Sequence, residues 1–259
     1  MSHGNLVVKW NQALSFSPLM AKSTKGPSVF WPGCAALKLD SAFIGNAYNI
    51  LKRSVPQLGF SSFCCGKPTF AVGIEKEKDK KNILLSKYFK EYGINTIYTL
   101  CPNCKLTLEN KYNINVIPAW PVIAENLRAD DKKDKIFKDT YILHDPCASR
   151  EDKASHEAIR QILSYFEIDF QEFTHCKEKA QCCGRKNMIF LTEPETSKKM
   201  LQNRIKDANN LPIITYCESC VEAFREGHKE AFHILELIDG SFSERSFLNR
   251  INNANKFKN

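Results

Sequence analysis

The cysteines of this chain form a pattern that occurs twice. Each copy has a single cysteine, then a vicinal pair followed by glycine, then a Cys-x-x-Cys motif. The first copy consists of Cys34, Cys64, Cys65, Cys101 and Cys104, and the second of Cys147, Cys182, Cys183, Cys217 and Cys220. Of the 11 cysteines, this leaves only Cys176 outside the pattern. Self-similarity of this kind predicts two copies of one structural unit.

The sequence between the cysteines alternates between short apolar runs and longer amphipathic segments in both halves. We expect strands at 28–34, 94–100 and 115–117 in the first half and at 140–147, 211–216 and 232–237 in the second. Helices are expected at 40–52, 75–91, 151–166 and 193–208, with an extended piece carrying each CCG. This alternation predicts the α/β class, with two similar Rossmann-like parallel-sheet halves related by internal duplication.

The repeat also suggests how the chain is divided. We predict an N-terminal extension (1–27), a first CCG domain (28–131), a charged linker (132–139), a second CCG domain (140–240) and a C-terminal helical tail (241–259). Ligands of open parallel sheets bind at the carboxyl ends of the strands, and most of the cysteines follow strands there. Each half is therefore expected to gather its five thiols, with metal sites in the cleft between the halves.

Composition narrows the function classes. No apolar run approaches the roughly 20 residues of a membrane span, and the first residues do not resemble a secretory signal. We therefore expect a cytoplasmic protein. Peripheral attachment to a membrane complex is compatible with this expectation. Its thiols should then be reduced and available for metal or redox chemistry. The formal charge of +8 comes largely from mixed charge runs, which do not indicate nucleic-acid binding.

Five thiols per half favour an iron–sulfur cluster over zinc. A Cys-x-x-Cys at a helix start stabilises thiolates through the free backbone N–H groups, but this motif alone serves several metals. A structural zinc site takes four ligands, so a fifth thiol and a vicinal pair have no obvious use there. Several irons in one cluster can use neighbouring thiolates. Gly66 and Gly184 would allow the backbone to take positive φ beside them.

The duplicated C…CCG…CxxC pattern resembles the cysteine-rich CCG-domain family, which includes an iron–sulfur component of heterodisulfide reductase, and His144-Asp-Pro-Cys147 looks like the opening of its second repeat. The resemblance implies two [4Fe-4S] clusters of the non-cubane type, held by the two copies given above. Catalysis would take place at the clusters themselves. The chain departs from the family in a short first interval and in lacking a ferredoxin-type CxxCxxC run. The resemblance therefore implies that electrons arrive from a flavoprotein or ferredoxin-type partner subunit.

Three functions remain open at this point. The first is an iron–sulfur oxidoreductase subunit that transfers electrons or reductively cleaves a small disulfide. The second is a pure electron-relay subunit of a lactate- or glycerol-3-phosphate-type dehydrogenase. The third is a zinc-stabilised, non-catalytic binding module, and zinc in one repeat alone is a further alternative for the cofactor.

Several other side chains are candidates for smaller roles. Cys176 is interpreted as a free buried cysteine, with a spare ligand or a substrate-facing thiol as the alternatives. His144 and His175 flank the second cysteine set and could donate protons, hydrogen-bond cluster sulfur or have ordinary polar roles. Lys67 and Arg185 each follow a CCG, where they would raise a cluster's reduction potential or simply carry surface charge. Trp31 is expected to pack in the core or shield a cluster.

Overall fold

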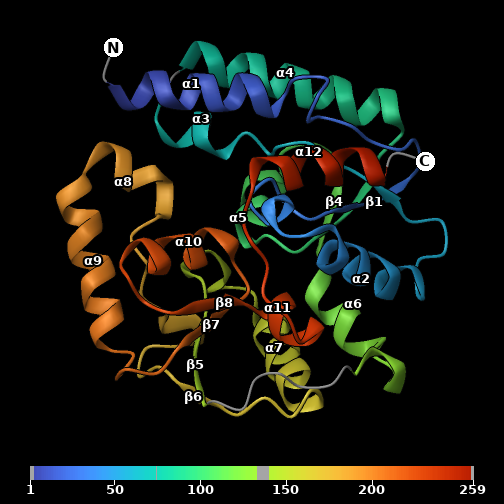
Figure 1. Cartoon of the computed structure of the whole chain (residues 1–259). Helices are drawn as coiled ribbons and strands as arrows, with labels where there is room; N and C mark the ends of the chain where they lie inside the picture. The colour runs from blue at the N-terminus through green and yellow to red at the C-terminus, as the bar shows by residue number, and fades with distance from the viewer. Residues whose placement is uncertain (1–2, 74, 133–139, 258–259) are drawn as a thin grey trace. The chain divides into compact units, whose positions relative to one another are not determined.

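A computed structural model of the chain describes residues 3–73, 75–132 and 140–257 (Figure 1). The chain divides into an N-terminal unit, made of Met1–Ala119 with Glu244–Asn259, and a C-terminal unit, Trp120–Ser243. Most of the predicted linker, residues 133–139, lies outside the described residues. The domain boundaries inferred from the repeat remain a prediction.

The N-terminal unit is built on a four-stranded parallel sheet with the order β2-β1-β3-β4. Its strands are β1 (Ser28–Trp31), β2 (Gly59–Phe60), β3 (Thr96–Thr99) and β4 (Asn115–Pro118). Val29, Phe30 and Trp31 are all fully buried, which is typical of a central strand covered on both faces. The predicted apolar run at 28–34 is therefore the centre of this sheet.

Helices and one 3₁₀ turn surround this sheet. They are α1 (His3–Ser15), η1 (Ala36–Lys38), α2 (Ser41–Lys52), α3 (Lys67–Ala71), α4 (Glu75–Tyr92), α5 (Pro102–Leu108) and α12 (Phe247–Lys256). Helix α12 comes from the end of the chain and packs on the loop that follows β1, where the Asn253 side-chain amide donates to the carbonyls of Leu37 and Leu39, both at 2.9 Å.

The C-terminal unit repeats the same sheet, with the order β6-β5-β7-β8 and all pairs parallel (Figure 1). Its strands are β5 (Tyr141–His144), β6 (Phe170–Glu172), β7 (Ile213–Thr215) and β8 (Ala231–His233). The α-helices of this part are α6 (Ala119–Glu125), α7 (Lys153–Tyr165), α8 (Ile189–Thr192), α9 (Pro194–Lys206), α10 (Glu218–Glu226) and α11 (Ile234–Asp239). The 3₁₀ turns are η2 (Ala129–Asp131), η3 (Cys147–Ser149), η4 (Lys177–Lys179) and η5 (Lys186–Met188).

The identical strand order confirms the predicted α/β class and the duplication of a Rossmann-like unit. One strand was predicted wrongly, because only the first part of 232–237 is extended and α11 begins at Ile234. The helix starts there because the His233 ring accepts a hydrogen bond from the Leu235 amide while Glu236 accepts one from the His233 amide. None of the helices in the described residues combines the length and apolar character needed to cross a membrane.

Candidate metal centre

The four cysteines that follow central strands lie at the carboxyl ends of those strands, as the sequence predicts. Cys34 and Cys101 follow β1 and β3, and Cys147 and Cys217 follow β5 and β7. Cys101 and Cys217 are also the residues that cap α5 and α10, so each Cys-x-x-Cys opens a helix. The amides of Cys104 and Cys220 donate to the carbonyls of the capping cysteines three residues before, at 3.0 and 2.8 Å.

Five thiols meet in the N-terminal unit, and we call them the first thiol set. The Sγ atoms of Cys34 and Cys64 are 3.8 Å apart. Cys64 is in hydrogen-bonding contact with Cys65, Cys65 with Cys104, and Cys104 with Cys101. The five cysteines predicted from the first repeat therefore form one continuous array of sulfur atoms.

The second thiol set, in the C-terminal unit, has the same order of contacts. Cys147 is in hydrogen-bonding contact with Cys182, and Cys182 with Cys183. The Sγ atoms of Cys183 and Cys220 are 3.1 Å apart, and Cys220 also contacts Cys217. All ten residues predicted from the repeats are thus brought together, five in each unit, and all are free thiols.

The thiols of each set shift one another's pKa in a way that suits metal binding. In the first thiol set, hydrogen bonds from Cys104 and Cys64 lower the pKa of Cys65 to about 5, whereas the hydrogen bond with Cys64 and burial raise the pKa of Cys34. In the second thiol set, contacts with Cys147 and Cys183 hold the pKa of Cys182 well below its usual range. A metal ion can replace the protons of such thiols, and five thiolate donors match an iron–sulfur cluster better than tetrahedral zinc.

The glycine of each CCG motif has the positive φ predicted for it. Gly66 lies at φ +78° and Gly184 at φ +88°. Their amides point back at the first sulfur of the vicinal pair, at 3.4 Å from Cys64 Sγ and 3.3 Å from Cys182 Sγ. The glycine therefore lets the backbone turn so that an N–H stabilises the thiolate two residues before it.

Replacing Gly184 by alanine is expected to destabilise the protein by about 1–3 kcal/mol. The alanine backbone would be strained at φ +88°, and its Cβ would lie 2.6 Å from the Ser197 carbonyl oxygen. Gly73→Ala is the matched control, since Gly73 has φ +72° but a Cβ there meets no described atom within 4 Å. Urea unfolding measures both variants. Equal midpoints for the two would show that the contact with Ser197 does not matter.

An N-terminal side chain that sequence analysis missed reaches the first thiol set. Gln12 of α1 is almost fully buried, and its amide Nε2 donates to Cys64 Sγ at 3.5 Å. Its Oε1 accepts from the Thr69 hydroxyl at 3.3 Å. The segment predicted as an extension before the first domain therefore supplies a hydrogen bond to a candidate ligand. A glutamine in an amphipathic helix gives no sequence signal for such a role.

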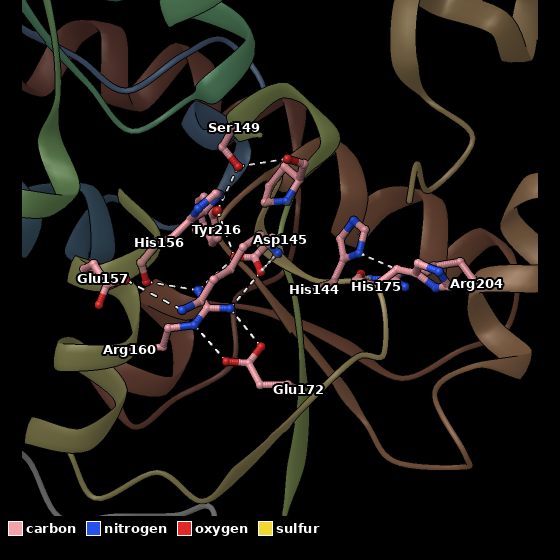
Figure 2. Close-up of polar contacts among 12 residues, drawn as sticks. His144, Asp145, Ser149, His156, Glu157, Arg160, Glu172, His175, Arg204 and Tyr216 are labelled. Atoms are coloured by element: carbon pink, nitrogen blue, oxygen red, sulfur yellow. Dashed lines mark hydrogen bonds and ion pairs between the residues drawn. The ribbon is translucent and has the colours of Figure 1, made fainter. Parts of the chain in front are cut away.

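The loop that carries Cys147 is fixed by Asp145 (Figure 2). This carboxylate is fully buried and accepts from both terminal nitrogens of Arg160, at 3.0 and 2.7 Å. It also accepts from the Tyr216 hydroxyl at 3.1 Å and the Lys177 amide at 2.8 Å. Burial raises the pKa of Asp145, but the hydrogen bonds and charge of Arg160, together with the hydrogen bond from the Lys177 amide and the charge of His156, outweigh burial and lower that pKa. Asp145 therefore links the loop of Cys147 to the segment that leads to the second CCG.

Two buried arginines were also missed by sequence analysis. Arg204 lies on α9, is 1% exposed, and donates through Nε to His144 Nδ1 at 3.2 Å (Figure 2). Arg250 lies on α12 and is 5% exposed. The hydrogen bond with Cys64 and burial raise the pKa of Cys34, and the positive charge of Arg250 partly offsets this rise. Both sit in helices rich in charged or polar residues, where no local sequence pattern marks a buried arginine.

The remaining sequence candidates lie around the thiol sets. Lys67 donates to the Asn103 side chain at 2.5 Å, and Arg185 pairs with Glu226, so each cation already has a partner within its own unit. Cys176 is partly exposed, not buried as expected, and burial together with nearby carboxylates raises its pKa.

Comparison with known proteins agrees with the thiol geometry. The sequence profile of the cysteine-rich domain called CCG matches residues 28–109 and 141–225, and the chain belongs to this family. Each matched segment contains all five cysteines of its own thiol set.

Three curated relatives share about a quarter of their aligned residues with the chain. An iron–sulfur protein of Methanocaldococcus jannaschii is 26% identical over 231 residues, covering 84% of this chain and 44% of the relative. One component of the fumarate reductase (CoM/CoB) of Methanothermobacter marburgensis is 26% identical over 200 residues, covering 70% of this chain and 39% of the relative. One component of the dihydromethanophenazine:CoB–CoM heterodisulfide reductase of Methanosarcina barkeri is 25% identical over 225 residues, covering 78% of this chain and 54% of the relative.

The chain thus spans about half or less of the length of these relatives, and it is related to iron–sulfur proteins and reductase subunits. Among solved structures, aspartate racemase of Picrophilus torridus aligns with 88% of this chain and all of that one, with 12% identity and a TM-score of 0.35. A similarity this low has no bearing on function.

Proposed function

We propose that this chain is the iron–sulfur subunit of an oxidoreductase, in which each thiol set holds one [4Fe-4S] cluster of the non-cubane type. The observation that carries the proposal is the gathering of ten thiols into two sets of five with the same order of contacts. The relatives named as iron–sulfur proteins and reductase subunits support it.

When bound, each cluster supplies a site that accepts and returns single electrons. The chain's own residues hold it and exclude water. Cys65, Cys104, Cys183 and Cys220 are nearly inaccessible to solvent, and the aromatic rings of Trp31 and Phe63 pack in the same buried cluster as Cys65. The amides of Gly66 and Gly184 stabilise sulfur through hydrogen bonds. Burial and these donors set how readily an electron is accepted.

We propose a disulfide as the substrate class, with electrons supplied by a flavoprotein or ferredoxin-type subunit. Cleaving one disulfide consumes two electrons and two protons and yields two thiols. The relative from Methanosarcina barkeri is named for the reduction of a heterodisulfide of coenzymes B and M, which supports this class. The relative named as part of a fumarate reductase favours a second candidate, in which the chain only relays electrons to another subunit.

The two candidates differ in what reoxidises the reduced protein. The protein is reduced with dithionite under anaerobic conditions, freed of excess reductant by gel filtration, and mixed with the heterodisulfide of coenzymes M and B. For a disulfide reductase we expect visible absorbance to return to the oxidised level, with two thiols released per disulfide consumed. Reoxidation by ferricyanide but not by the heterodisulfide would identify a relay, and a colourless protein would contradict both.

A further inference from the structure

One position is equivalent in the two units and lies at the end of the central strand. Trp31 ends β1 and pairs in register with Thr99 of β3, whereas His144 ends β5 and pairs with Thr215 of β7. Each residue stands three positions before the first cysteine of its thiol set. The duplication therefore places Trp31 and His144 at the same point relative to the two thiol sets.

Both side chains bury a ring nitrogen that lacks a partner. Trp31 and His144 are fully buried, and neither Trp31 Nε1 nor His144 Nε2 has a hydrogen-bond partner among the described residues. Leaving a buried donor unsatisfied costs about 1–3 kcal/mol. Such a cost at the same position of both repeats indicates an acceptor that the protein atoms themselves do not supply.

The two residues lie beside equivalent thiols. Trp31 belongs to the same buried cluster as Cys65 and Cys104. A ring nitrogen of His144 and the Sγ atoms of Cys183 and Cys220 all lie within 4.8 Å of one another. Cys183 and Cys220 occupy the positions in the second repeat that Cys65 and Cys104 occupy in the first. His144 thus lies beside two thiols of its set, and Trp31 shares a buried cluster with the two equivalent thiols of the other set.

A hydrogen bond from Arg204 decides what His144 can do there (Figure 2). Arg204 Nε–H donates to His144 Nδ1 at 3.2 Å, so Nδ1 acts as the acceptor and the ring proton of the neutral imidazole lies on Nε2. The Cζ atom of Arg204 lies 3.5 Å from the centre of the Phe173 ring, which holds the guanidinium in place. Arg204 also donates to the His175 carbonyl at 2.9 Å. A metal-ligating Nε2 would need the proton on Nδ1, which would then face the Arg204 donor.

We propose that Trp31 Nε1–H and His144 Nε2–H each donate a hydrogen bond to sulfur of the cluster held by their own thiol set, and that Arg204 is a positioning residue that fixes the His144 tautomer. This inference rests on the proposed function. Because a reduced cluster carries more negative charge, a donor to its sulfur stabilises the reduced form and raises the reduction potential. The first cluster receives its hydrogen bond from an indole and the second from an imidazole.

The test uses variants that remove one donor and keep part of the surrounding contacts. Trp31→Phe removes the indole N–H and keeps an aromatic ring. His144→Asn keeps an acceptor for Arg204 near the Nδ1 position and loses the Nε2 donor, whereas His144→Gln keeps a donor near Nε2. Potentials are measured by redox titration followed by electron paramagnetic resonance. Titrating the variants also in a Cys65→Ser or Cys183→Ser background assigns each signal to one thiol set.

We expect Trp31→Phe to make reduction of the first cluster about tenfold less favourable and His144→Asn to do the same to the second cluster only. For a one-electron couple, tenfold corresponds to about 59 mV. His144→Gln should recover part of the loss. Each variant is the matched control for the other, because its effect must stay within its own unit.

The outcomes separate this inference from the proposed function. A native protein without iron and sulfide would overturn the proposed function. Clusters present with unchanged potentials in Trp31→Phe and His144→Asn would overturn the inference alone. Loss of iron from the second thiol set in His144→Asn, with the circular dichroism of the fold intact, would make His144 a ligand and would also overturn it. If His144→Asn does not fold, the potential of Trp31→Phe decides.

Discussion

A chain carrying Cys183→Ser is expected to lose about half of its iron and visible absorbance, with the loss confined to the second thiol set. Cys183 is 2% exposed and contacts both Cys182 and Cys220, so its sulfur lies inside the array and not at its edge. A serine hydroxyl is a poor ligand for iron compared with thiolate. Iron analysis and absorbance spectra of the anaerobically purified variant measure the effect.

Two companions sharpen this experiment. Cys65→Ser should remove the other half of the iron, because Cys65 has the equivalent place in the first thiol set. Cys176→Ser is the matched control, since Cys176 lies outside both arrays and should keep all of the iron. Full iron content in Cys65→Ser and Cys183→Ser would mean that these two cysteines are not ligands of the clusters.

Replacing Asp145 by asparagine is expected to lower the free energy of unfolding by about 3 kcal/mol or more, because it breaks a buried ion pair by removing one partner. Arg160 would keep the more exposed carboxylate of Glu172, at 2.8 Å, and the His156 carbonyl, at 3.0 Å. The Tyr216 hydroxyl and the Lys177 amide, which now donate to Asp145, would face an amide in place of a carboxylate.

Glu167→Gln is the control for this change, because Glu167 pairs with Lys132 at 3.3 Å on the surface, where both side chains are largely exposed. Its effect should stay within about 0.5 kcal/mol. Urea unfolding compares the two variants under the same conditions. Equal stabilities would show that the Asp145 network does not hold the loop of Cys147 in place.

The fold class could be predicted from the sequence because two physical signals agreed. Buried parallel strands give short, continuous apolar runs, and the cysteines supplied a register that aligned one half with the other. The end of β8 could not be predicted in this way. The run from Phe232 to Leu237 is largely apolar, and the helix start within it depends on a capping contact between His233 and Glu236.

The thiols of the site could be predicted, but the side chains around them could not. Cysteine spacing marks candidate ligands directly, whereas Arg204 lies in a helix whose composition is typical of a solvated surface. Its burial results from tertiary contacts with Phe173 and His144, which no local pattern encodes. Gln12 was hidden for the same reason, since its contact with Cys64 spans more than fifty residues of sequence.

The content of iron, acid-labile sulfide and zinc in the anaerobically purified native chain tests the central claim most directly. Two [4Fe-4S] clusters predict about eight iron atoms and about eight sulfides per chain, with little zinc. A colourless protein with no sulfide and one or two zinc ions per chain would contradict the assignment of both thiol sets.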